Sequence, residues 1–111
     1  MKQSDAVAAL KALAQDSRLA AYRALVQAGP EGLAVGDLGE RLKLPGATLT
    51  NHLNVLRQAG LVRDAREGRS IRSRADYARM NALLGFLTEN CCGSDAAECA
   101  PACAPKRRKR S

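Results

Sequence analysis

The sequence predicts a small, mainly α-helical domain that carries one β-hairpin, and two stretches are responsible for this prediction. Residues 35–62 read as two amphipathic helices joined by a tight turn, and residues 61–74 read as two short extended segments around a glycine. A chain of 111 residues is long enough for one domain with a modest core. We therefore expect a single domain that gains stability from a partner.

The helix pair is defined by its apolar spacing and by the turn inside it. The first helix has apolar residues at i, i+3 and i+7, namely Val35, Leu38 and Leu42. The turn at 43–46 contains Pro45, which lacks the N–H that a helix interior needs, and Gly46 can cap the next helix. That helix covers residues 47–59 and ends at Gly60. Its apolar stripe is Leu49, Leu53 and Leu56.

The outward face of the second helix differs from an ordinary solvated surface. It carries neither lysine nor glutamate, and it offers short hydrogen-bonding side chains and one arginine. Such side chains suit contacts with base edges and phosphates in a DNA major groove. A simple solvated face would be the interpretation if the helix stood alone. The candidate base contacts are Thr48, Thr50, Asn51, His52 and Asn54, and Arg57 is a candidate phosphate contact.

Arginines dominate the extended segments that follow. Residues 61–66 and 70–74 flank Glu67-Gly68-Arg69, and this stretch contains five arginines and no lysine. An edge hairpin can carry charge merely to stay soluble. Guanidinium groups nevertheless favour phosphate recognition. A hairpin directly after a DNA-reading helix is the wing of a winged helix-turn-helix, so we expect Arg66 and Arg69 on the DNA backbone.

A further helix precedes the pair. Asp16 or Ser17 can cap it, and Gly29-Pro30 ends it. Its expected core stripe is Leu19, Tyr22, Leu25 and Val26.

The first and last helices are expected to form a homodimer interface. The first begins near Ser4 or Asp5, and the last follows an Asp76 cap and runs to about Asn90. A terminal helix this apolar in so small a domain suggests a seam between two copies. The expected interface residues are Val7, Leu10, Leu13, Met80, Leu83, Leu84 and Leu87. Two copies would place two reading helices on a palindromic site.

Charge supports a polyanionic partner. The net charge is +7, and residues 41–79 alone hold nine basic groups against three acidic ones. Two Tyr, one Phe and no Trp give little stacking surface for single strands, which favours double-stranded DNA. The start shows no signal peptide, and no apolar run approaches a membrane span. We therefore expect a cytoplasmic protein with no membrane partner.

Four cysteines lie within 13 residues near the C-terminus: Cys91, Cys92, Cys99 and Cys103. In a reducing compartment they should be thiols rather than a disulfide framework. Two adjacent thiolates can turn toward one ion when a spacer brings back a third, and residues 93–98 are long enough to do so. Soft thiolates select soft centres. Trivalent arsenic or antimony needs three sulfurs, which Cys91, Cys92 and Cys99 supply, whereas Cys103 would be spare.

As a set, these motifs resemble the arsenic repressor (ArsR/SmtB) family of winged helix-turn-helix metalloregulators. Residues 48–62 are similar to the recognition-helix signature of the family. Asp16-Ser17-Arg18-Leu19 and Arg66-Glu67-Gly68-Arg69 are similar to its second-helix start and its wing turn. The likeness covers roughly residues 5–90. It implies a homodimeric repressor that leaves its operator when a metal or metalloid binds.

The ligands depart from the commonest pattern of that family. Ala34-Val35-Gly36 stands where many arsenic sensors have Cys-Val-Cys, and the single histidine, His52, lies in the reading helix rather than in a zinc site of the last helix. The C-terminal Cys-Cys and following Cys resemble a subgroup of arsenic repressors. This resemblance makes As(III) or Sb(III) the expected effector.

Two alternatives for the thiols stay open. Four cysteines could hold Zn²⁺ or Cd²⁺, although CxxC spacing is missing, or they could form a peroxide or disulfide switch, although Glu89, Asp95 and Glu98 disfavour thiolates. No phosphate loop or nucleophile paired with a base is present, so we expect neither an enzyme nor an organic cofactor. The expected organisation is a DNA-binding and dimerisation domain at 1–90 and a metalloid-binding segment with a basic tail at 91–111.

Overall fold

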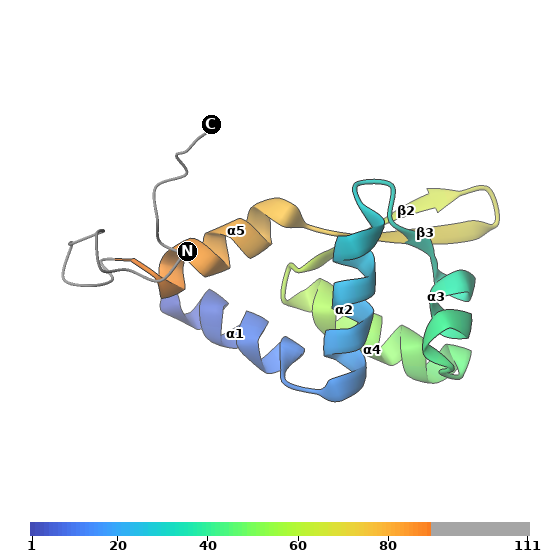
Figure 1. Ribbon diagram of the computed structural model, residues 1–111, viewed down its shortest axis with the longest axis horizontal. Coiled ribbons are helices and arrows are strands. Elements are labelled where there is room, and N and C mark those ends of the chain that lie inside the picture. Colours follow the sequence, from blue (N-terminus) through green and yellow to red (C-terminus); the bar gives the residue numbers. More distant parts are fainter. Residues whose placement is uncertain (90–111) are drawn as a thin grey trace.

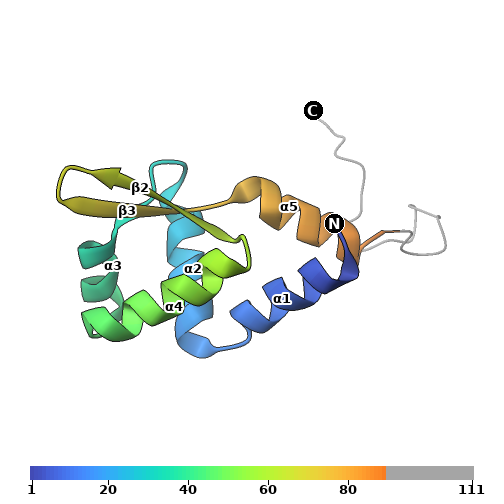
Figure 2. The same cartoon turned by 180° about the vertical axis from the view of Figure 1, so that it is seen from behind.

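The computed structural model describes residues 1–89, which form a winged helix-turn-helix (Figures 1 and 2). Within these residues five helices accompany one three-stranded sheet. The helices are α1 (Gln3–Leu13), α2 (Asp16–Ala28), α3 (Val35–Leu42), α4 (Gly46–Gln58) and α5 (Tyr77–Leu87). The strands are β1 (Leu33–Ala34), β2 (Val62–Glu67) and β3 (Ser70–Ala75). The predicted fold class is therefore confirmed. The predicted segment 91–111, with all four cysteines, lies outside the described residues.

The expected helix pair is present as α3 and α4, with two small differences. Lys43 takes the left-handed conformation (φ 58°), and its amide donates to the Glu40 carbonyl, so α3 closes at the expected turn. Helix α4 begins at Gly46, one residue early, because Pro45 serves as the N-cap residue. Gly60 (φ 81°) follows the end of α4 as expected.

The core is built around α4. Its predicted stripe, Leu49, Leu53 and Leu56, is at most 1% exposed. Leu25 of α2, Leu38 of α3 and Leu61, which follows α4, are fully buried with it. Helix α2 crosses α4 in both views, while α1 and α5 lie side by side at the end of the molecule away from the wing (Figures 1 and 2). The core thus fixes α4 from behind and leaves its opposite face in solvent.

The predicted core stripe of α2 was partly wrong, whereas the stripe predicted for a dimer interface on α1 leaves Val7 and Leu10 exposed. Helix α1 buries Ala6, Ala9 and Ala12 rather than Val7 and Leu10. In α2 the expected core residues Leu19 and Val26 are 44% and 37% exposed, and alanines share the buried face with Tyr22 and Leu25. Small side chains let these helices approach their neighbours closely, so the alanine face packs inward and the larger residues point outward.

Caps were predicted for four helices and were correct at one, since Pro45 and not the expected Gly46 is the N-cap residue of α4. Asp76 caps α5, where its Oδ1 accepts from the Arg79 amide at 3.0 Å. Lys2 precedes α1 with no side-chain cap, so neither Ser4 nor Asp5 serves there. Gln15 caps α2, accepting from the Arg18 amide at 2.8 Å, because the helix already starts at Asp16. Helix α5 ends at Leu87, short of the expected Asn90, which lies outside the described residues.

A third strand, β1, pairs with the hairpin that β2 and β3 form. The strand order is β1-β3-β2, all antiparallel, with Leu33 opposite Ser73 and Ser73 opposite Asp64. Strand β1 has only two residues, and no sequence pattern predicted it. Gly32 (φ 69°) permits this pairing, since a Cβ there would lie 2.1 Å from the Ser73 carbonyl oxygen.

Candidate nucleic-acid interface

The exposed face of α4 carries the residues expected to contact bases. Thr50 and Asn51 are exposed, and Thr48, His52 and Asn54 are half-buried along the flanks. The fully buried stripe on the opposite face fixes the rotation of the helix, so this polar face must point outward. Short hydrogen-bonding groups are therefore presented on a rigid helix, the geometry that reading base edges requires.

Arg57 is held by contacts within the protein. Its Nη2 lies 2.6 Å from Asp64 Oδ2 of β2, and its Nη1 donates to Asn54 Oδ1 one turn earlier in α4. The other oxygen of Asp64 accepts from Ser73 Oγ of β3 at 2.7 Å. We call Asn54, Arg57, Asp64 and Ser73 the strut cluster, since it joins the reading helix to both strands of the wing.

The wing has two faces with different arginines. Cross-strand partners share a face, so Asp64 and Ser73 lie with Arg66 and Ile71 on the side turned to α4. Arg69, in the turn between β2 and β3, is exposed, as is Arg66. These two arginines lie toward the tip of the wing, beyond the strut cluster.

The opposite face of the wing contains the other three arginines. Arg72 donates to Glu67 at 3.3 Å and to the carbonyls of Glu31 and Gly32 at 3.3 and 3.2 Å. Arg63 and Arg74 are direct cross-strand partners. These arginines face away from α4, so they add positive charge without belonging to the face that carries the reading residues.

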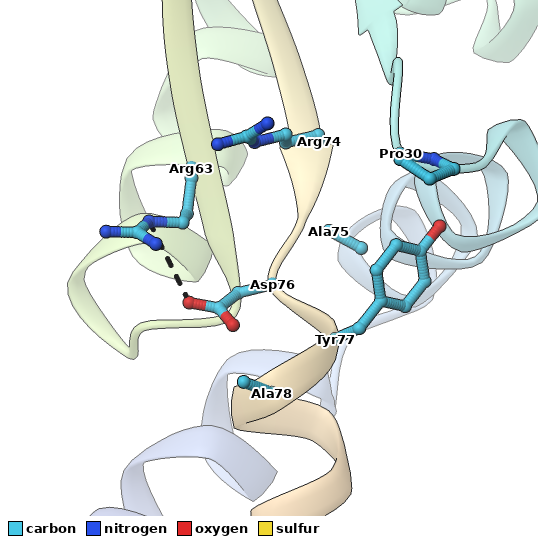
Figure 3. Close-up of a pocket in the computed structure, with 7 residues that line it drawn as sticks. All are labelled: Pro30, Arg63, Arg74, Ala75, Asp76, Tyr77 and Ala78. Atoms are coloured by element: carbon cyan, nitrogen blue, oxygen red, sulfur yellow. Dashed lines mark ion pairs between the residues drawn. The ribbon is translucent and has the colours of Figure 1, made fainter.

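A shallow hollow lies at the base of this opposite face (Figure 3). Figure 3 shows the guanidinium groups of Arg63 and Arg74 on one side and the Tyr77 ring facing Pro30 on the other. Arg63 Nε is 3.9 Å from Asp76, and the Tyr77 hydroxyl donates to the Val26 carbonyl at 2.9 Å. The hollow therefore lies between the wing, the start of α5 and the loop that follows α2.

The expected dimer residues divide into an exposed and an internal group. Val7 and Leu10 of α1 are 42% and 43% exposed, and Leu84 and Leu87 of α5 are 49% and 52% exposed. Leu13 and Met80 are half-buried against the core, and Leu83 is 2% exposed inside the protomer. Leu83 is therefore placed in the protomer core, whereas the four exposed residues are available to a partner.

A metal site cannot be located in the described part of the chain. Within residues 1–89 no three His, Cys, Asp or Glu side chains lie close enough to hold an ion. The expected ligands Cys91, Cys92, Cys99 and Cys103 all follow residue 89. Among the described residues, no helix has the length and apolar character to cross a membrane.

Comparison with known proteins agrees with the fold. A family model described as a helix-turn-helix domain matches residues 13–65. YceK of Bacillus subtilis, an uncharacterized HTH-type transcriptional regulator, is 38% identical over 73 residues, covering 63% of this chain and 72% of YceK. The transcriptional activator HlyU of Vibrio cholerae is 33% identical over 82 residues, covering 74% of this chain and 73% of HlyU.

The likeness extends to solved structures. The chain is similar to the homodimeric winged helix-turn-helix DNA-binding domain of Mb0332 from Mycobacterium bovis, a possible ArsR-family transcriptional regulator. The TM-score is 0.62 at 28% identity, over 78% of this chain and 81% of that one. The chain belongs to the ArsR-type winged helix-turn-helix transcriptional regulators. In this ArsR-type regulator α3 and α4 are the helix-turn-helix, and β2 and β3 are the wing.

Sequence reasoning missed half of the strut cluster in this ArsR-type regulator. Asp64 and Ser73 lie in the predicted hairpin, and no role was assigned to either from the sequence. The register that places them opposite each other depends on the Gly68-Arg69 turn, and the contact to Arg57 depends on how the hairpin returns over α4. The available signal was an acid seven residues after the only arginine of the helix.

Proposed function

We propose that this ArsR-type regulator is a homodimeric repressor that binds a palindromic operator and leaves it when As(III) or Sb(III) binds. The observation that carries DNA recognition is the exposed, lysine-free polar face of α4 beside an arginine-tipped wing. Thr48, Thr50, Asn51 and His52 contact bases, while Arg66 and Arg69 contact phosphates. Arg57, in contrast, contacts Asn54 and pairs with Asp64 within the protein.

Homodimer formation is supported by two observations. Four apolar side chains of α1 and α5 stand exposed in the protomer, at the end of the molecule where the two helices adjoin. The similar domain from Mycobacterium bovis is homodimeric. Two protomers joined through α1 and α5 would present two α4 helices to successive major grooves.

The DNA contacts are tested with a duplex that the wild-type protein selects from a random pool. Asn51→Ala should weaken binding to this duplex by about 1–3 kcal/mol and change nonspecific binding little, because a base contact is lost. Arg69→Ala should weaken both and lower the salt slope by about one. Arg23→Ala, which removes an exposed arginine of α2, is the charge-matched control. Unchanged affinity and slope in both test variants would refute these assignments.

The effector is proposed from the donor set alone. Three thiolates of Cys91, Cys92 and Cys99 match the three bonds that trivalent arsenic forms, and soft sulfur ligands select soft ions. Binding there would shift the dimer toward a shape whose two α4 helices no longer fit the operator. A coupling of about 1–3 kcal/mol, about 5- to 150-fold in affinity, is usual for such switches.

Serine substitutions test the three-thiolate site. Cys103→Ser should keep the response of operator binding to arsenite, since this thiol is spare. Cys91→Ser, Cys92→Ser and Cys99→Ser should each abolish the response, because two sulfurs cannot complete the arsenic site. The measurement is operator binding against arsenite concentration, and a fully responsive Cys99→Ser protein would exclude the model.

A redox switch and a Zn²⁺ or Cd²⁺ sensor are the alternatives on the same cysteines. Titrating operator-bound protein with arsenite, antimonite, zinc and cadmium salts and peroxide separates them, because a redox switch alone responds to peroxide and is restored by thiol. A reporter behind the operator decides the direction of regulation. Repression predicts higher expression when the protein is deleted, whereas activation, as named for the Vibrio relative, predicts lower expression.

A further inference from the structure

The strut cluster connects elements that the chain itself joins only loosely. Three residues separate the last residue of α4 from Val62, the first residue of β2, and Gly60 in this link has a positive φ. Val62 and Ala75 at the base of the hairpin are buried. Each residue from Arg63 to Ile71 is exposed when its backbone and side chain are counted together. The hairpin therefore projects from the core, and a small change at its base would displace its tip.

The Asp64 carboxylate is held at both oxygens. Oδ2 pairs with Arg57 Nη2 at 2.6 Å, and Oδ1 accepts from Ser73 Oγ at 2.7 Å, with Ser73 completely buried. The side chains of Arg57 and Asp64 are 36% and 23% exposed. Charge-assisted contacts at both oxygens leave this carboxylate little rotational freedom. The contact is thus a defined link on the α4 side of the wing.

Arg57 is equally constrained. Its Nη1 donates to Asn54 and its Nη2 pairs with Asp64, while its Nε is buried without a hydrogen-bond partner among the described residues. These contacts hold the guanidinium against Asn54 and Asp64, and with Nε buried only the second N–H of each terminal nitrogen is left for another acceptor. Moving it to DNA would also leave Asp64 without its positive partner.

If only charge is considered, the position of Asp64 is unfavourable for DNA binding. It places a negative group on the wing face turned toward α4, beside the proposed phosphate contacts. The other acid of the wing, Glu67, lies on the opposite face and pairs with Arg72 at 3.3 Å. An acid on the DNA side lowers attraction for phosphate unless its contacts improve the fit.

We infer that Arg57 and Asp64 are positioning residues that fix the wing against the reading helix, and that Arg57 is not a phosphate contact. This inference rests on the proposed DNA-binding function and refines it. The pair sets the angle of the hairpin, so that Arg66 and Arg69 meet the backbone when α4 occupies the groove.

Asp64→Asn gives the sharpest test because charge and positioning predict opposite signs. Removing an acid should strengthen DNA binding if the residue acts only through charge. Loss of the Arg57–Asp64 contact should weaken DNA binding by about 2- to 100-fold, which corresponds to the usual interaction energies of residues in contact. Glu67→Gln is the matched control, since it removes an equal charge from the other face, and its affinity should stay equal or rise.

Arg57→Ala and the double variant complete a thermodynamic cycle on the selected duplex. Arg57→Ala should weaken binding while leaving the salt slope unchanged, and Arg57→Ala/Asp64→Asn should be no weaker than the worse single variant. A slope reduced by about one in Arg57→Ala would make Arg57 a phosphate contact and overturn the inference. Equal or tighter binding by Asp64→Asn would also overturn it. Urea unfolding of each variant identifies any loss caused by misfolding.

A measurement on the DNA-free protein separates this inference from the proposed function. Amide ¹⁵N relaxation should report greater mobility at residues 66–70 in Asp64→Asn than in the wild type, with α4 unchanged. Unchanged relaxation at the wing tip would refute the positioning role of Arg57 and Asp64, even if the protein binds no DNA. Increased mobility in the variant, together with no DNA binding by the wild type, would support the positioning role of Arg57 and Asp64 and would contradict the proposed function.

Discussion

Tyr22 shows how a single side chain can be buried at a cost. Its ring is 2% exposed in α2, and its hydroxyl is buried without a hydrogen-bond partner among the described residues. Burial, followed by the negative charge of Asp76 and by Tyr77, raises the pKa of Tyr22 from 10.0 to about 12. A buried hydroxyl that lacks a partner costs about 1–3 kcal/mol.

Tyr22→Phe should therefore leave the protein as stable as the wild type or more stable at pH 7. The folded protein holds the Tyr22 proton more tightly than the unfolded chain, so this contribution to stability is complete below pH 10 and declines between pH 10 and about 12. The variant should lose less stability over that range. Urea unfolding at pH 7 and at steps from pH 9.5 to 12 measures both effects.

Tyr77→Phe is the control for this prediction. The Tyr77 hydroxyl donates to the Val26 carbonyl, so its removal should cost about 0.5–1.5 kcal/mol at pH 7. If Tyr22→Phe cost as much, the Tyr22 hydroxyl would have a partner and the interpretation of its pKa would fail.

At the scale of elements, the helix ends show what sequence can and cannot locate. Asp76 was predicted correctly because it directly follows an extended segment and precedes an apolar run. Asp16 and Ser17 were wrong because several polar residues in a row make alternative starts equally plausible, and Gln15 takes the position. One residue of difference changes which side chain can reach the free amides of the first turn.

Asp76→Ala should destabilise the protein by about 1 kcal/mol, because the Arg79 amide loses its acceptor at the start of α5. Gln15→Ala should also destabilise the protein, through loss of the Arg18 contact. Ser17→Ala should change the free energy of unfolding by less than about 0.5 kcal/mol. Urea titration gives all three values, and a Ser17→Ala loss equal to that of Asp76→Ala would place the α2 cap at Ser17.

At the scale of the whole molecule, the fold of one protomer leaves an apolar patch on α1 and α5 exposed to solvent. Of the stripe expected along α1, Val7 and Leu10 are exposed, whereas the helix buries Ala6, Ala9 and Ala12. Leu84 and Leu87 of the adjoining α5 are exposed as well. Together they form the surface through which we expect two protomers to associate.

Leu84→Glu/Leu87→Glu should shift the protein toward monomers while the fold is kept, because both side chains are already about half exposed. A carboxylate buried in an apolar interface without a partner is strongly unfavourable. Sedimentation velocity over a concentration series measures the change, and circular dichroism checks the helices. Leu19→Glu, at an equally exposed site on α2, should stay dimeric. Dimers of unchanged affinity in the double variant would place the interface elsewhere.

The DNA-reading unit was predicted almost completely from local patterns. Apolar spacing placed Leu49, Leu53 and Leu56 in the core, as found, and it placed the proposed reading residues on the opposite face. These features are local, because helical periodicity alone decides which side chains share a face. The same logic failed in part for α2, where Leu19 and Val26 are exposed because an alanine face competes with the larger apolar residues and the close approach of neighbouring helices decides between them.

The sequence by itself determined the order of the elements, the turn between α3 and α4, the position of the wing and the family to which the chain belongs. Only the tertiary structure decided that Arg57 meets Asp64, that Leu83 lies in the core while Leu84 does not, and that β1 joins the wing. The physical reason is the range of the interactions. Turns, caps and periodicity depend on residues a few positions apart, whereas these contacts depend on how separate elements pack against each other.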